Sequence, residues 1–209
     1  MSGRIHIDLF TTLDGVSQAP GGPEEDTDGG FAFGGWQAPL IGESDGEQII
    51  EGIRAMDALL LGRRTYDIFA GYWPHQLAGP DAEIARRFDA IPKYVASRGA
   101  PDLGWRDSHL LGPDLAAELD ALRERHREIH VIGSIDFART LLAESLFDQL
   151  NLWVYPIVVG PGKRLFEPDG PPAGLTLLEI SGPSATGAVL LRYAPTGVVP
   201  ETGDMTPAD

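Results

Sequence analysis

The sequence of 209 residues contains no cysteine. This absence excludes disulfides, thiolate metal sites and a cysteine nucleophile, and it is typical of proteins that work in the cytoplasm. No apolar run approaches the roughly 18 residues of a membrane helix, and residues 1–8 lack the apolar core of a signal peptide. We therefore expect a cytoplasmic protein without a membrane partner.

Positive charge is also scarce. The 16 Lys and Arg residues face 31 Asp and Glu residues, which gives a formal net charge of −15 at pH 7. Such a chain repels a phosphate backbone at long range, so we expect no nucleic-acid partner. Because Lys93 and Lys163 are the only lysines, a local phosphate site would depend on arginine, whose guanidinium grips phosphate through two hydrogen bonds. The base composition of the genome would explain this bias equally well.

Several common site motifs are missing. The histidines are His6, His75, His109, His126 and His130. None of them forms the H-E-x-x-H motif of zinc enzymes, so the sequence predicts no metal site. Residues 160–164 are not a P-loop, because Ile157 and Arg164 stand where that motif requires Gly and Ser or Thr. No G-x-G-x-x-G motif follows a predicted strand, which excludes a Rossmann fingerprint.

The sequence does contain a regular alternation of strand and helix patterns. Strand patterns cover 4–10, 58–62, 93–97, 129–133 and 150–155. Helical patterns follow a capping box at Ser44 and Glu47, then recur over 83–91, over 115–127 after Asp114 as N-cap, and over 137–146. Helices interposed between strands make those strands parallel, through right-handed crossovers. The fold class is therefore α/β, with a central mixed, mostly parallel sheet flanked by helices.

The last third of the chain differs from this alternation. Residues 175–180 and 187–193 form two strand patterns with only a turn between them, which predicts antiparallel C-terminal strands. We expect one domain over residues 1–195 and a flexible tail over 196–209, where apolar periodicity is missing. Residues 20–35 are rich in Gly, Pro and acids and long for a connection, which is typical of a mobile or functional loop such as a lid.

Three predicted strand ends carry groups that suit an anion. Residues 62–65, Gly-Arg-Arg-Thr, follow one strand and open a short helix with two guanidinium groups, a hydroxyl and free backbone N–H groups. Ser97 and Arg98 follow another strand and suit a monophosphate such as the 2′-phosphate of NADP. Gly133 and Ser134 precede a helix whose positive end suits a pyrophosphate. A solvated arginine pair and ordinary surface turns are the alternatives.

These segments resemble the dihydrofolate-reductase-like family, and most closely the C-terminal reductase domain of the bifunctional deaminase-reductase of riboflavin biosynthesis. The resemblance covers roughly residues 4–195 and rests on the order of seven segments: 13–15, 57–66, 95–97, 131–134, 146–150, 155–162 and 165–166. Gly133-Ser134 stands where dihydrofolate reductases carry Gly-Gly, which favours the riboflavin type.

The resemblance implies the dihydrofolate-reductase-like fold, NADPH as cofactor and a homodimer formed through the C-terminal apolar strands. It implies a reductase of the 5-amino-6-(5-phosphoribosylamino)uracil reductase or dihydrofolate reductase type, acting on a small planar heterocyclic or carbonyl substrate. The implied cofactor-binding residues are Gly62, Arg63, Arg64 and Thr65 at the phosphates, Ser97 and Arg98 at the 2′-phosphate, Gly133, Ser134, Ile135, Asp136 and Phe137 at the pyrophosphate, and Thr12 and Gly15 near the nicotinamide. Asp136 would repel the pyrophosphate unless its side chain points away.

The catalytic acid is encoded less clearly than the cofactor site. The resemblance implies an acidic residue on the helix before Gly62, where Asp45 and Glu47 are the candidates, although both also suit a helix N-terminus. Asp14 is a further candidate and is equally compatible with an Asx turn. A non-catalytic NADP(H)-binding module or redox sensor on the same fold is therefore the alternative function.

Four aromatic residues are candidates to wall a flat substrate: Trp36, Tyr66, Phe69 and Trp73. Packing in the core is the alternative for each, and it is favoured for Phe69. Trp36 lies in the acidic, Gly-rich segment, where a core role is harder to predict.

Overall fold

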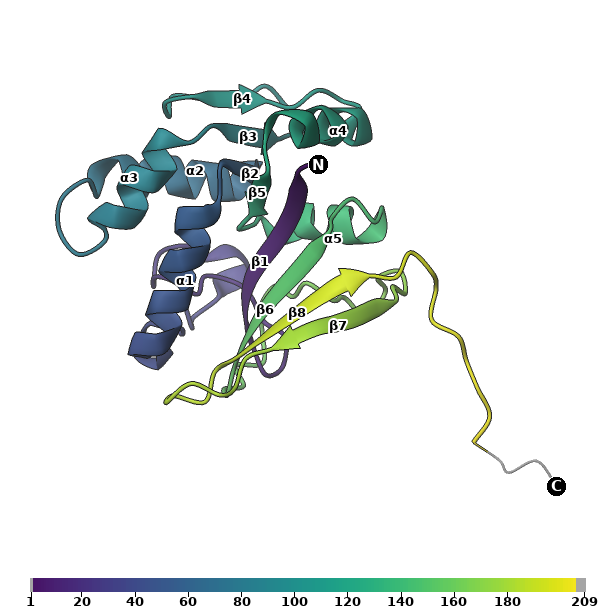
Figure 1. The fold of residues 1–209 in the computed structure, drawn as a ribbon. Helices are drawn as coiled ribbons and strands as arrows, with labels where there is room; N and C mark the ends of the chain where they lie inside the picture. The colour runs from purple at the N-terminus through teal and green to yellow at the C-terminus, as the bar shows by residue number, and fades with distance from the viewer. Residues whose placement is uncertain (1, 206–209) are drawn as a thin grey trace.

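The computed structural model describes residues 2–205 and contains one sheet of eight strands (Figure 1). The strands are β1 (Arg4–Thr12), β2 (Ala58–Gly62), β3 (Lys93–Ala96), β4 (Ser108–Leu110), β5 (Glu128–Val131), β6 (Gln149–Tyr155), β7 (Leu175–Ile180) and β8 (Val189–Pro195). Their order across the sheet is β4-β3-β2-β5-β1-β6-β8-β7. β1 to β6 are parallel, and β8 pairs antiparallel with both β6 and β7. The predicted mixed sheet and C-terminal hairpin are therefore confirmed.

Helices cover both faces of this sheet. They are α1 (Glu43–Ala55), α2 (Arg63–Tyr72), α3 (Ala82–Ala90), α4 (Leu115–Arg125) and α5 (Ile135–Ala143), with short 3-10 helices η1 (Asp28–Gly30), η2 (Ala38–Leu40) and η3 (Trp73–His75). One apolar cluster packs α4 and α5 on the sheet, and a second packs α1, α2 and α3 on the other face. Within residues 2–205, no helix is long and apolar enough to cross a membrane.

The alternation of side chains along each strand separates these two clusters. Ile5, Ile7 and Leu9 of β1 point into the cluster of α4 and α5, so His6 and Asp8 point to the opposite face. β2 is buried along its whole length, as its apolar sequence predicts. Burial of one such aliphatic side chain stabilises the fold by roughly 1.5–3 kcal/mol.

Some boundaries differ from the sequence prediction. α1 begins at Glu43 instead of after the predicted capping box, because Asp45 lies three residues after Gly42 and its carboxylate accepts the Gly42 N–H over 3.1 Å. β5 ends at Val131, and the backbone then turns to a φ of +132° at Gly133. β4 was not predicted because its three residues are too few to show a period, and two of them are exposed. Asp114 does cap α4, since its side chain accepts the Ala117 N–H over 3.2 Å.

The predicted tail begins in contact with the domain. The Thr196 N–H donates to the Gly174 carbonyl over 2.9 Å, and the Gly174 N–H donates to Val198 over 3.2 Å. Residues 199–205 contain no helix or strand, and 206–209 lie outside the described residues.

Candidate functional site

The carboxyl ends of β3, β2 and β5 bring together the three predicted anion-binding segments. These strands are parallel neighbours, so their ends lie at one edge of the sheet. Gly62 at the end of β2 is in register with Ala96 of β3, so Ser97 follows beside the start of α2. The Gly62 N–H donates to the Gly133 carbonyl over 3.0 Å, which holds the loop after β5 against the same point.

Two glycines permit this close approach. A Cβ on Gly62 would overlap Ser134 Oγ and lie 2.9 Å from the Cβ of Phe137. A Cβ on Gly133 would lie 2.7 Å from Thr65 Oγ1, and its φ of +132° disfavours any L side chain. As a result, the N-termini of α2 and α5 lie side by side, with the Thr65 hydroxyl facing Gly133.

The two arginines of α2 are both engaged by carboxylates. Arg63 Nε lies 2.6 Å from Asp67 one turn along the helix. Arg64 contacts Asp26 at 2.7 Å and Asp28 at 3.1 Å, both in the acidic segment 20–35. Lys163 contacts the same two carboxylates at 2.8 and 2.9 Å. The hydrogen bond from Lys163, together with the charges of Lys163 and Arg64, lowers the pKa of Asp28. The acidic segment is thus tied to Arg64, a predicted phosphate-binding residue, and no sequence pattern predicts Lys163 beside it.

Two other predicted residues are open to a phosphate. Ser97 Oγ accepts the Gly99 N–H over 3.2 Å, and Arg98 is exposed without an ion pair to any residue in the described range. Asp136 in the first turn of α5 is exposed, and its carboxylate accepts a hydrogen bond from Arg139 over 2.8 Å. Its charge is therefore partly neutralised within the helix.

Thr12, Asp14 and Gly15 form a tight turn at the end of β1. The Thr12 hydroxyl donates to Asp14 over 2.6 Å, and the backbone N–H of Gly160 donates to the same carboxylate over 2.9 Å. Partial burial favours the neutral acid, but these hydrogen bonds outweigh it and lower the pKa of Asp14. Asp14 is thus an anion that holds the turn against the loop at Gly160, and Gly15 has the positive φ of +85° that the turn needs.

Asp45 occupies a different position, buried at the N-terminus of α1. Its carboxylate accepts the Gly42 N–H and lies 3.4 Å from the Thr186 hydroxyl. Gln37 donates to the buried Tyr155 hydroxyl over 2.8 Å. Burial and the charge of Asp45 both raise the pKa of Tyr155, whereas the Gln37 hydrogen bond lowers it. Sequence reasoning missed Gln37 and Tyr155, because the alternation of β6 shows only that Tyr155 faces inward.

The candidate aromatic residues do not form one wall. Trp36 is buried with its ring edge against Tyr155, at 5.6 Å between centroids, and its indole N–H donates to the Gln18 carbonyl. Tyr66 and Phe69 lie in the separate cluster of α1, α2 and α3, where Phe69 stacks on Phe88 at 5.8 Å. Trp73 packs in that cluster as well. Only Trp36 therefore lies beside the polar group of Tyr155.

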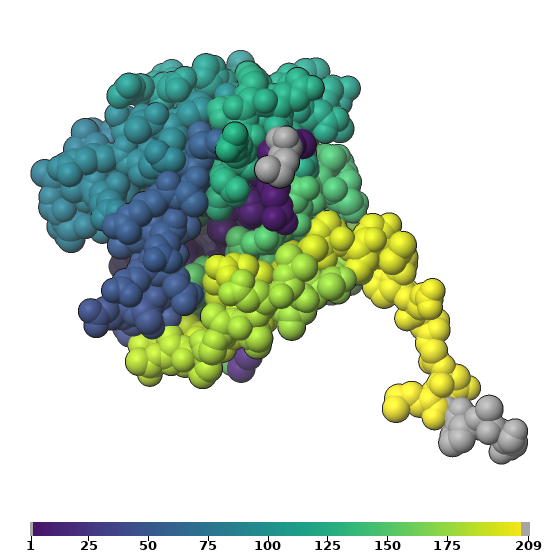
Figure 2. All heavy atoms as spheres, in the orientation of Figure 1, coloured from purple at the N-terminus to yellow at the C-terminus, as the bar shows by residue number. Residues whose placement is uncertain are grey.

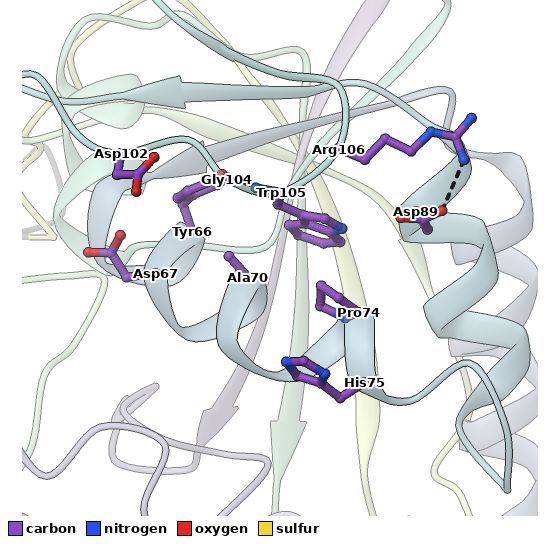
Figure 3. A pocket seen from close by; sticks show the side chains of 10 residues that line it. All are labelled: Tyr66, Asp67, Ala70, Pro74, His75, Asp89, Asp102, Gly104, Trp105 and Arg106. Atoms are coloured by element: carbon purple, nitrogen blue, oxygen red, sulfur yellow. Dashed lines mark hydrogen bonds and ion pairs between the residues drawn. The ribbon is translucent and has the colours of Figure 1, made fainter.

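An open groove of about 460 Å³ lies along the outer side of α2 (Figure 3). Its lining residues are Tyr66, Asp67, Ala70, Pro74, His75, Asp89, Asp102, Gly104, Trp105 and Arg106. Tyr66, Asp67 and Ala70 point away from the side of the helix that carries Thr65, so the groove is separate from the strand ends. Its Arg106 is paired with Asp89 at 3.1 Å.

Known proteins resemble this chain in sequence and in structure. The uncharacterized protein YyaP of Bacillus subtilis is 25% identical over 170 residues, which cover 78% of this chain and 80% of YyaP. A protein of Shewanella sp. PV-4 named for riboflavin biosynthesis is 18% identical, with a TM-score of 0.69 over 92% of this chain and 99% of that one. Dihydrofolate reductase from Enterococcus faecalis, solved with NADP(H) and RAB-propyl, is 12% identical, with a TM-score of 0.57 over 94% and 98% of the two chains. The two structural similarities show the dihydrofolate-reductase-like fold.

The family match covers most of the sequence. The RibD C-terminal domain family matches residues 4–188, which include the ends of β1, β2, β3 and β5. The fold and the match agree on a reductase-type domain, and the chain belongs to the RibD C-terminal domain family.

Proposed function

We propose that this protein is an NADPH-dependent reductase that passes a hydride from the nicotinamide to a small planar heterocyclic or carbonyl substrate. One observation carries the proposal: Gly62 and Gly133 set the N-termini of α2 and α5 side by side at one sheet edge. Two helix N-termini at one point supply free N–H groups and positive partial charge for a pyrophosphate. The RibD family match and the NADP(H) bound to the Enterococcus faecalis reductase support this choice of cofactor.

In this proposal the chain holds the phosphates through three groups of residues. Arg63, Arg64 and Thr65 bind phosphate oxygens, while the backbone of 133–137 lines the pyrophosphate. Ser97 and Arg98 bind the 2′-phosphate, and Arg98 needs no release from an ion pair within the described chain. The turn at Thr12 and Gly15 lies at the carboxyl end of β1, on the same sheet edge, and in this proposal the nicotinamide ring binds beside it.

We propose Asp45, rather than Asp14, as the acidic residue of the substrate site. Asp14 has a lowered pKa and is committed to Thr12 and Gly160, so it cannot supply a proton at neutral pH. Asp45 is buried, lies near the Thr186 hydroxyl and acts electrostatically on Tyr155. In this proposal these groups and Trp36 are the polar and apolar side chains beside a flat substrate.

Binding of NADPH is the first test of this proposal. Nicotinamide fluorescence during titration should report saturable binding, and Arg98→Ala should weaken it about tenfold, equivalent to roughly 1.4 kcal/mol. Arg54→Ala is a matched control, because Arg54 is an exposed arginine on α1 that pairs with Glu83 on α3. Absence of a fluorescence change at millimolar NADPH would refute the proposal.

A non-catalytic NADP(H)-binding module is the second candidate. It is favoured by the packing of Tyr66 and Phe69 in the core, which leaves fewer aromatic groups for a substrate. Oxidation of NADPH in the presence of pterin, pyrimidine and quinone compounds separates the two candidates. An enzyme should consume NADPH with at least one class, and Asp45→Asn should lower kcat more than it alters the Kd of NADPH.

We further propose a cytoplasmic homodimer, the compartment being supported by the lack of cysteine. The edge strand β7 exposes Leu177, Leu178 and Ile180, which makes it the apolar surface that a second copy would cover. Sedimentation should give a dimer for the natural chain and a monomer for Leu178→Glu. A natural chain that sediments as a monomer at micromolar concentration would contradict this.

A further inference from the structure

A cluster of polar side chains lies on the sheet face opposite α4 and α5, on strands β1 and β5. His6 and His130 are register partners on these neighbouring strands, and their rings stack with centroids 4.8 Å apart and 15° between planes. Glu128 points to the same face two residues before His130, with Oε2 2.9 Å from His6 Nε2. Figure 2 shows atoms of β1 in purple at the floor of a hollow between α1 and the C-terminal hairpin.

The Nε2 atoms of both histidines are buried without a hydrogen bond to any residue between 2 and 205. Each histidine is only 6% exposed. The Glu128 carboxylate is close to His6 Nε2 but lacks the alignment of a hydrogen bond, so the contact is one of charge and proximity. Buried polar atoms are almost always paired, and two unpaired ring nitrogens facing a carboxylate therefore indicate a missing ligand.

The environment of His130 fixes which of its nitrogens is available. Its Nδ1 lies 2.7 Å from Asp8 Oδ2, and Asp8 Oδ1 accepts a hydrogen bond from Asn151 over 2.7 Å. When Nδ1–H donates to Asp8, the neutral ring presents a lone pair at Nε2. A carboxylate behind the ring is the usual arrangement of a histidine that binds a metal ion.

We propose that His6, His130 and Glu128 bind one divalent transition-metal ion of the zinc class. Two imidazole nitrogens and one carboxylate oxygen suit zinc and its neighbours, whereas magnesium and calcium prefer oxygen ligands alone. One ligand atom from each residue lies within 4.8 Å of the other two. For an ion to lie about 2.1 Å from all three ligand atoms, the distances between these atoms must shorten by on the order of 1 Å. Rotation of the two imidazole rings and of the half-exposed Glu128 side chain would provide this movement. Three protein ligands leave a fourth position for water.

Metal uptake by tag-free protein stripped with a chelator tests the site. Titration with Zn²⁺ at pH 8 should show one equivalent bound, and Co²⁺ should give visible absorption bands of a low-coordinate nitrogen and oxygen site. Mg²⁺ should not compete. His130→Gln and Glu128→Gln should each weaken Zn²⁺ binding at least tenfold.

His109→Gln is the matched control, because His109 is exposed and pairs with Asp107 away from the cluster. It should bind Zn²⁺ like the natural chain. Glu128 is half exposed, so Glu128→Gln remains decisive if the buried His130→Gln variant fails to fold. The proposal is overturned if the natural chain binds no stoichiometric Zn²⁺ at pH 8, or if Glu128→Gln binds it unchanged.

Discussion

The ion pairs of Asp26 make a quantitative prediction about cofactor affinity. The Asp26 side chain is 11% exposed and contacts Arg64 at 2.7 Å and Lys163 at 2.8 Å. If Arg64 binds a phosphate of NADPH, the cofactor must compete with this carboxylate for the same guanidinium. Asp26→Asn keeps the shape of the side chain but removes its charge, so NADPH should bind more tightly.

The size of the effect follows from the exposure of the pair. Ion pairs at the surface are worth about 0.2–1 kcal/mol, and Arg64 is half exposed while Asp26 is nearly buried, which places this pair at the upper end. Release of about 1 kcal/mol corresponds to roughly fivefold tighter binding. By the same change Lys163 loses one of its two carboxylate partners and keeps Asp28, which adds some attraction for the phosphates.

Fluorescence titration with NADPH at low ionic strength measures this change in Kd. In an Arg64→Ala background the gain from Asp26→Asn should shrink, because only Lys163 then loses a carboxylate partner. Glu83→Gln, which frees the remote Arg54, is the control and should leave Kd unaltered. Weaker binding by Asp26→Asn would refute the reasoning, since it would mean that the acidic segment assists the cofactor instead of competing with it.

Three further predictions concern stability. Gly62→Ala should destabilise the fold by roughly 1–3 kcal/mol in urea unfolding, because its Cβ would lie 2.9 Å from that of Phe137. Gly71→Ala, in the adjoining helix α2, meets open space and should be neutral or stabilising. Lys93→Met should lower the free energy of unfolding by roughly 2–4 kcal/mol, because the buried Nζ donates to the carbonyls of Phe88, Ile91 and Asp89. Arg54→Met, at an exposed site, should lower it little. A loss below about 0.5 kcal/mol for Lys93→Met, the size of a surface change, would contradict this role. The metal-free protein should lose stability as the pH rises above 6.5, because the Asp8 carboxylate outweighs burial and raises the pKa of His130, so the folded state keeps a proton that the unfolded chain releases. Asp8→Asn should flatten that slope in denaturant titrations, and an unchanged slope would exclude the pair as its source.

The sequence predicted the sheet well because strand and helix periods are local properties. The apolar run at 58–62 and the alternation from Arg4 onward specify buried strands regardless of their neighbours. The start of α1 was predicted wrongly, since Ser44 and Asp45 both offer capping groups and only the packing beside Thr186 selects Asp45. Local chemistry alone could not make that choice.

Relations between distant segments were the part that the sequence could not supply. Trp36, Tyr66 and Phe69 all suit a flat ligand, but their separation into two clusters depends on which side of the sheet each segment crosses. The pairing of His6 with His130 likewise requires β5 to lie beside β1, although three other strands separate them along the chain. The residue pattern of each strand does not show which strand lies beside it.

The central place of β1 has a consequence for how the protein is made. This strand is translated well before its partners β5 and β6, which begin at Glu128 and Gln149. At about 5–20 residues per second, translation leaves the β1 backbone unpaired for several seconds. A nascent chain that stops before Glu128 has neither neighbour for β1, so an interrupted product is a candidate for chaperone capture or degradation rather than a smaller folded unit.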